Sequence, residues 1–102
     1  MKPQNIIATV CDRKGRVLAV GKNSYVKTHP KQYELAKRAG EPKKVYLHAE
    51  ISAIIKAQKQ GKPFKIKIER FSKDGNLLSS EPCPICKLAI KEAGISFVEY
   101  SI

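Results

Sequence analysis

The segment VYLHAEISAI places a histidine and a glutamate at the start of an otherwise apolar helix. The helical pattern runs from about Tyr46 to Gln60 and ends at Gly61. Helix residues two apart differ in direction by about 200°, so His48 and Glu50 would point apart in the middle of a helix. The two side chains can serve one site only in the first turn, where the helix end faces a pocket. The fold is therefore constrained to place a pocket at this helix end.

A second helix start carries two cysteines, in the segment SSEPCPICKLAI. Cys83 and Cys86 lie three residues apart, about one helical turn, so their side chains share a face. Pro82 and Pro84 are tolerated there because the first amides of a helix have no intrahelical partner. The positive end of a helix dipole also favours a thiolate. We expect both polar pairs to open helices.

Together the two pairs have the composition of a zinc site. Two thiolates and one imidazole are three good zinc ligands, and they leave the fourth tetrahedral position to water. Zinc lowers the pKa of that water towards neutrality. Glu50 is not needed as a ligand and can take and return the proton of the water. His48, Cys83 and Cys86 are the predicted ligands.

The remaining segments predict an α/β domain with the element order β-β-α-α-β-α-β. Strands are expected on both sides of the turn at 12–15, at 64–71 and at 95–102, and helices at about 30–39, 46–60 and 83–93. Helical crossovers should make the later strands parallel. We expect residues 1–102 to form one domain with three layers, α/β/α, around a mixed four-stranded sheet.

The HAE and PCxxC motifs, on helices separated by a strand, resemble the zinc-dependent cytidine and deoxycytidylate deaminase superfamily. The resemblance covers nearly the whole chain in element order. It implies that His48, Cys83 and Cys86 bind zinc and that Glu50 is the catalytic proton shuttle. Family members usually continue with another helix and strand, whereas this chain ends at Ile102, so it is identified as a C-terminally short member.

The resemblance also implies where a substrate would bind. Asn23, in the segment VGKN, matches the G-x-N pattern of the family and would contact the substrate. The backbone at Ala49, and around Ser80 and Glu81, would line the pocket near the exocyclic amine. The implied reaction is hydrolysis of that amine to a carbonyl, with release of ammonia.

The first choice of substrate is a small molecule, a cytosine nucleoside or nucleotide. The segment EPCP is close to that of adenosine and guanine deaminases, so the base stays open. A deaminase of single-stranded DNA or RNA and a non-catalytic, zinc-stabilised nucleic-acid-binding module are alternatives, because the net charge of +11 favours any anionic partner. Glu50 distinguishes these classes, since a binding module does not need a carboxylate beside the metal.

The cysteines allow two simpler interpretations. The segment CPIC is also typical of a redox dithiol, but that leaves Glu50 unexplained. A closed structural zinc site would need a fourth ligand, for which His29 and Cys11 are the obvious donors. Cys11 lies in an apolar run and is expected to be a small buried hydrophobic residue.

The sequence also suggests where the protein works and how it associates. No run is long enough to span a bilayer, and the segment MKPQNIIATV lacks the apolar core of a signal peptide. We therefore expect a cytoplasmic protein without membrane contact. The strands at 64–71 and 95–102 should lie near a sheet edge or a thinly covered face, which favours a homo-oligomer that hides them.

Overall fold

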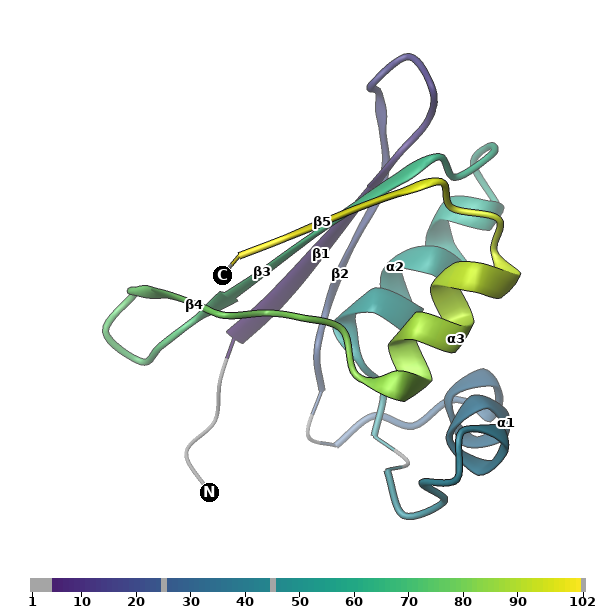
Figure 1. The fold of residues 1–102 in the computed structure, drawn as a ribbon, viewed down its shortest axis with the longest axis vertical. Helices are drawn as coiled ribbons and strands as arrows, with labels where there is room; N and C mark the ends of the chain where they lie inside the picture. Colours follow the sequence, from purple (N-terminus) through teal and green to yellow (C-terminus); the bar gives the residue numbers. More distant parts are fainter. Residues whose placement is uncertain (1–4, 25, 45, 102) are drawn as a thin grey trace.

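The computed structural model describes residues 5–24, 26–44 and 46–101 and contains a five-stranded mixed sheet (Figure 1). Ile102, the predicted end of the last strand, lies outside the described residues. The elements, in chain order, are β1 (Asn5–Cys11), β2 (Val17–Lys22), α1 (Pro30–Arg38), α2 (Ala49–Gln58), β3 (Lys65–Phe71), β4 (Leu77–Leu78), α3 (Pro84–Glu92) and β5 (Phe97–Tyr100).

The sheet is built around β1 and β3. β1 pairs antiparallel with β2 on one side and with β3 on the other. β5 pairs parallel with the first half of β3, and the two-residue β4 pairs antiparallel with the end of β3. Because β2 and β3 both run against β1, they are parallel to each other. The predicted parallel pairing of the last strand is confirmed.

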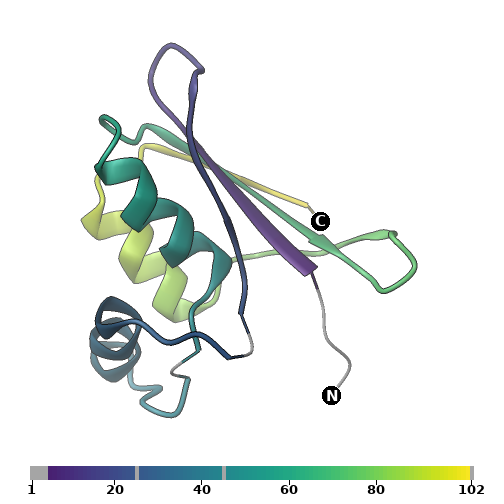
Figure 2. The same ribbon diagram turned by 180° about the vertical axis from the view of Figure 1, so that it is seen from behind.

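All three described helices lie on one side of the sheet (Figures 1 and 2). The connection from β2 to β3 passes over β1, and the connection from β3 to β5 continues in the same direction. Right-handed crossovers in one direction place their helices on the same face. The α/β class is confirmed, but the described residues form two layers instead of three. The sheet also has five strands instead of four, because the turn at 72–76 folds β4 back along β3.

The core lies between the sheet and the helices. Alternation along the strands buries Ala8, Val10, Ile66 and Ile68, which face α2 and α3, whereas Lys67 on the other face is exposed. The predicted half-buried strand at 64–71 is therefore confirmed. None of the described helices combines the length and the apolar character that crossing a membrane requires.

The backbone of α2 approaches β2 directly at Gly21. A Cβ atom there would lie 2.4 Å from the carbonyl oxygen of Ala49 and 2.5 Å from the backbone nitrogen of Ala53. Neither atom can give way without a shift of the first turns of α2. The absence of a side chain at Gly21 therefore sets the position of that helix end on the sheet.

We expect Gly21→Ala to lower the free energy of unfolding by about 1–3 kcal/mol, because the new methyl group overlaps fixed backbone atoms. Urea denaturation followed by circular dichroism measures the change. Gly61→Ala is the control, since a Cβ there would meet the Leu18 side chain at 3.2 Å, and that side chain can rotate. A loss no larger than that of the control would contradict the close approach.

Candidate metal centre and substrate cavity

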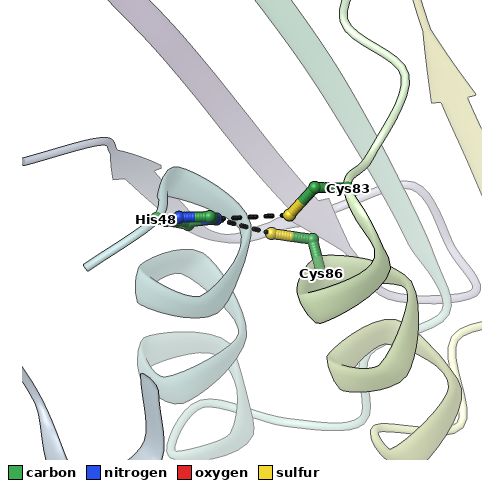
Figure 3. A group of neighbouring side chains, drawn as sticks. All are labelled: His48, Cys83 and Cys86. Atoms are coloured by element: carbon green, nitrogen blue, oxygen red, sulfur yellow. Dashed lines mark hydrogen bonds between the residues drawn. The ribbon is translucent and has the colours of Figure 1, made fainter. Parts of the chain in front are cut away.

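Two helix starts meet and bring the three predicted ligands together (Figure 3). His48 immediately precedes α2, Cys83 immediately precedes α3, and Cys86 lies in the first turn of α3. The Nδ1 atom of His48 lies 3.2 Å from Sγ of Cys86 and 3.5 Å from Sγ of Cys83. The ligand atoms of all three residues lie within 4.8 Å of one another.

This spacing fits a tetrahedral zinc ion. Zinc bonds of about 2.1 Å to nitrogen and 2.3 Å to sulfur hold those atoms roughly 3.6 Å apart. Among the described residues, the candidate ligands are His48, Cys83 and Cys86. Neither His29 nor Cys11 lies with them as a fourth ligand. His29 instead caps α1, where its Nδ1 accepts a hydrogen bond from the backbone N–H of Lys31. The donors therefore match an open zinc site and not a closed structural one.

The electrostatics of the group favour a thiolate. The pKa of Cys83 falls to about 3, first because the Cys86 thiol hydrogen-bonds to it and also because His48 lies beside it. The hydrogen bond to Cys83 and burial together raise the pKa of Cys86. The pKa of His48 is raised, chiefly by its hydrogen bond to Cys83. Cys83 is thus a thiolate, and the Cys86 thiol and His48 hold protons beside it. A metal dication that binds the three residues can replace those protons.

Glu50 lies in the first turn of α2 and is 6% exposed. Burial raises the pKa of its carboxyl group above the usual value. The residue lines the same cavity as His48 and Cys83. A carboxyl group with a raised pKa can both accept a proton and hold it, which suits general acid–base chemistry.

A cavity of about 390 Å³ opens beside the metal ligands. Three of the predicted substrate-binding residues, Asn23, Ser80 and Glu81, line it. Ala49, the first residue of α2, is fully buried and is not among the lining residues. Lys43, Lys44, Tyr46 and Arg70 also line the cavity.

Two of the predicted substrate-binding residues also hold the walls of the cavity. The Oδ1 atom of Asn23 accepts a 2.9 Å hydrogen bond from the backbone N–H of Ile6. The hydroxyl group of Ser80 donates to the carbonyl oxygen of Ile68 at 2.7 Å and accepts from the backbone N–H of Ser101 at 2.9 Å. The backbone N–H of Ser80 also donates to the carbonyl oxygen of Ser101 at 2.8 Å, so both its hydroxyl group and its N–H are used within the fold.

Gln32 supports the backbone of His48, a role that was not predicted from the sequence. The side chain is fully buried on α1, where its Oε1 accepts from the backbone N–H of His48 at 3.1 Å. Its Nε2 donates to the carbonyl oxygen of Lys44 at 3.0 Å. A sequence signal was available, because Gln32 shares a helix face with Leu35 and Ala36 at the spacing of an apolar stripe. A polar residue on such a stripe needs buried partners.

We expect purified protein to contain about one zinc ion per chain, because three soft ligands converge. Cys86→Ser should remove most of the zinc and lower the melting temperature, since metal binding is coupled to folding. Elemental analysis and thermal denaturation measure the two effects. Cys11→Ser is the matched control and should keep its zinc. Full zinc content in the Cys83→Ser, Cys86→Ser double variant would refute the ligand set.

Gln32→Met should weaken zinc binding by roughly 10- to 100-fold while all three ligands remain, because the partner of the His48 backbone is lost. Competition with a chelator of known affinity measures the change. Gln58→Met, on the exposed side of α2, is the control. Equal zinc affinity in the two variants would show that Gln32 does not position His48.

Comparison with known proteins agrees with this geometry. Residues 2–102 match the family model described as the cytidine and deoxycytidylate deaminase zinc-binding region. Among solved structures, the chain is similar to the guanine deaminase from Bacillus subtilis, with 25% sequence identity and a TM-score of 0.54. That match covers 94% of this chain and 48% of the other, so this chain spans about half of its length. No curated protein matches the chain.

The family match and the ligand geometry both indicate a zinc-binding region. The match extends over nearly the whole chain, and the group His48, Cys83 and Cys86 has the composition that a zinc-binding region requires. The structural similarity adds the fold of a deaminase. The chain therefore belongs to the zinc-binding deaminase family of cytidine and deoxycytidylate deaminases.

Proposed function

We propose that this protein is a zinc-dependent hydrolase that deaminates the base of a cytosine nucleoside or nucleotide. The observation that carries the proposal is the position of Glu50, a buried carboxyl group with a raised pKa that lines the cavity beside the metal ligands. A site that only held zinc would not need such a group. The family match supports zinc-dependent deamination, and it leaves the substrate to be identified.

The residues around the cavity supply the steps of the reaction. When bound by His48, Cys83 and Cys86, zinc would supply Lewis-acid activation of a water molecule. Glu50 would take one proton as the water adds to the amine-bearing carbon and pass it to the ring nitrogen. It would then take the second proton from the hydroxyl group on that carbon and pass it to the leaving amine. The carbon–nitrogen bond then breaks, ammonia leaves and a carbonyl group remains. The raised pKa of Glu50 suits this role, because the carboxyl group must hold the proton between two transfers.

The cavity is suited to a small molecule. Its volume of about 390 Å³ lies at the lower end of the range typical of small-molecule sites. Ile6 and Ile68 give it an apolar surface against which a base can pack. We propose that Asn23 and the backbone around Ser80 and Glu81 orient the substrate, and that the backbone of Ala49 contributes from the first turn of α2.

Guanine is the second candidate base. The similarity to a guanine deaminase supports it, although this chain spans only about half of that protein. Deamination of single-stranded nucleic acid is a further alternative, because the chain carries a net charge of +11. Glu50 argues against a non-catalytic binding module.

The homo-oligomer expected from the sequence stays a prediction. The sheet face opposite the helices supports it, because none of the described helices covers that face (Figure 2). Phe97, which pairs with Lys65 on that face, is 57% exposed. Association of two chains would remove such surface from water.

Release of ammonia from a panel of bases, nucleosides, nucleotides and oligonucleotides tests the proposal. Glu50→Gln should keep its zinc and lose roughly 100- to 10 000-fold in rate, because both proton transfers pass through this carboxyl group. Glu34→Gln, at an exposed glutamate of α1, should react like the original protein. Loss of zinc from Glu50→Gln would make Glu50 a ligand instead, and zinc-loaded protein inactive on the whole panel would refute the proposal.

A further inference from the structure

Arg70 differs from the other arginines because, in the part of the chain that the structure describes, its charge has neither an ion pair nor an aromatic ring beside it. Arg16 pairs with Asp12, Arg38 pairs with two glutamates, and Arg13 lies over an aromatic ring. Within residues 5–24, 26–44 and 46–101, Arg70 forms no ion pair. It is also half-buried, so water screens its charge less than that of an arginine on the surface.

The Arg70 side chain lies on the wall of the cavity that holds the metal ligands. Arg70 lies opposite Ile6 in the register of β3 and β1, on the same strand face as Ile68, and all three residues line the cavity. Its Nη1 donates a hydrogen bond to the carbonyl oxygen of Ser79 at 3.3 Å. Within the described residues, this is the one hydrogen bond of the Arg70 side chain. Its Nε is buried without an acceptor. A guanidinium group has five N–H donors, so most of this group is unused.

A half-buried cation without a counter-charge is unfavourable, and an anion from outside the chain would stabilise it. The planar fork of an arginine fits the oxygens of a phosphate group in a bidentate arrangement. The surroundings favour the same ligand, because Lys43 and Lys44 line the same cavity. Lys44 pairs with Glu41 at 3.1 Å, whereas no ion pair within the described chain neutralises Lys43.

We infer that Arg70 binds a phosphate group of the substrate, so that the site selects a nucleoside monophosphate over the nucleoside and the free base. The inference rests on the proposed function and narrows its substrate class. The cavity of about 390 Å³, which Arg70 lines together with His48 and Cys83, favours a mononucleotide over a polymer because its volume is at the lower end of the range for small-molecule sites. Arg70 is thus a specificity-determining residue, and it takes no part in the proton transfers.

The test is a ratio of two affinities, measured by calorimetry on zinc-loaded Glu50→Gln protein so that no ligand is consumed. For cytosine, adenine and guanine in turn, the affinity for the nucleoside 5′-monophosphate is divided by the affinity for the nucleoside. We expect a ratio of roughly 10 to 100 for the base that fits the site, from charge-assisted hydrogen bonds to the phosphate. A ratio near one for all three bases would overturn the inference.

Variants assign the ratio to Arg70. Adding Arg70→Gln should bring it close to one, whereas Arg70→Lys should retain part of it, because a point charge replaces the fork. Lys14→Gln removes one charge from the exposed turn between β1 and β2 and should leave the ratio unchanged. Circular dichroism and zinc content verify that each variant is folded. An unchanged ratio in folded Arg70→Gln protein would overturn the assignment.

Further measurements distinguish a mononucleotide from a nucleic-acid substrate, and distinguish failure of this inference from failure of the proposed function. A cytosine-rich oligonucleotide that binds more tightly than the monophosphate, with an affinity that falls steeply as salt is added, would overturn the choice of a mononucleotide. Equal catalytic efficiency of the original protein on a nucleoside and its monophosphate would contradict the inference and leave the proposed function standing. An intact affinity ratio without ammonia release would contradict the proposed function alone.

Discussion

The helices α2 and α3 direct their positive ends at the same small volume, and this arrangement needs negative charge to be stable. Each helix start carries about half a positive charge in unpaired backbone amides. The hydrogen bond from the Cys86 thiol and the neighbouring His48 lower the pKa of Cys83, and the resulting thiolate neutralises part of that charge. The close approach at Gly21 then sets α2 on the sheet and fixes where His48 meets the two sulfurs. The metal site thus follows from helix placement as well as from ligand chemistry.

The part of the site that depends on short spacings could be predicted from the sequence. Two residues on each helix start, with prolines beside the cysteines, were enough to predict that His48, Cys83 and Cys86 would converge. The helices and most strands also followed from their periodicity. Periodicity could not predict on which face of the sheet the helices lie, because that depends on the order of the strands. That order was available in principle, since successive crossovers in one direction share a face.

The rest of the site could not be predicted because it comes from contacts between distant segments. Gln32 lies 16 positions before the backbone N–H that it binds, and its role depends on how α1 docks. Arg70 is one charged residue among many in the sequence. Only the register of β3 against β1 places it on the cavity wall. The chain has 20 lysines and arginines, and no short sequence pattern indicates which of them is half-buried without an ion pair.

The hydrogen bonds between Ser80 and Ser101 connect the end of β5 to the loop that leads into Cys83. Strand ends are where local unfolding usually begins, and opening of such a segment takes less free energy than global unfolding. If β5 frays, the loop before Cys83 loses its hold on the sheet at the same moment. Exchange of zinc with solution would then follow the opening rate of this strand end, so that metal lability and amide hydrogen exchange in β5 report the same motion.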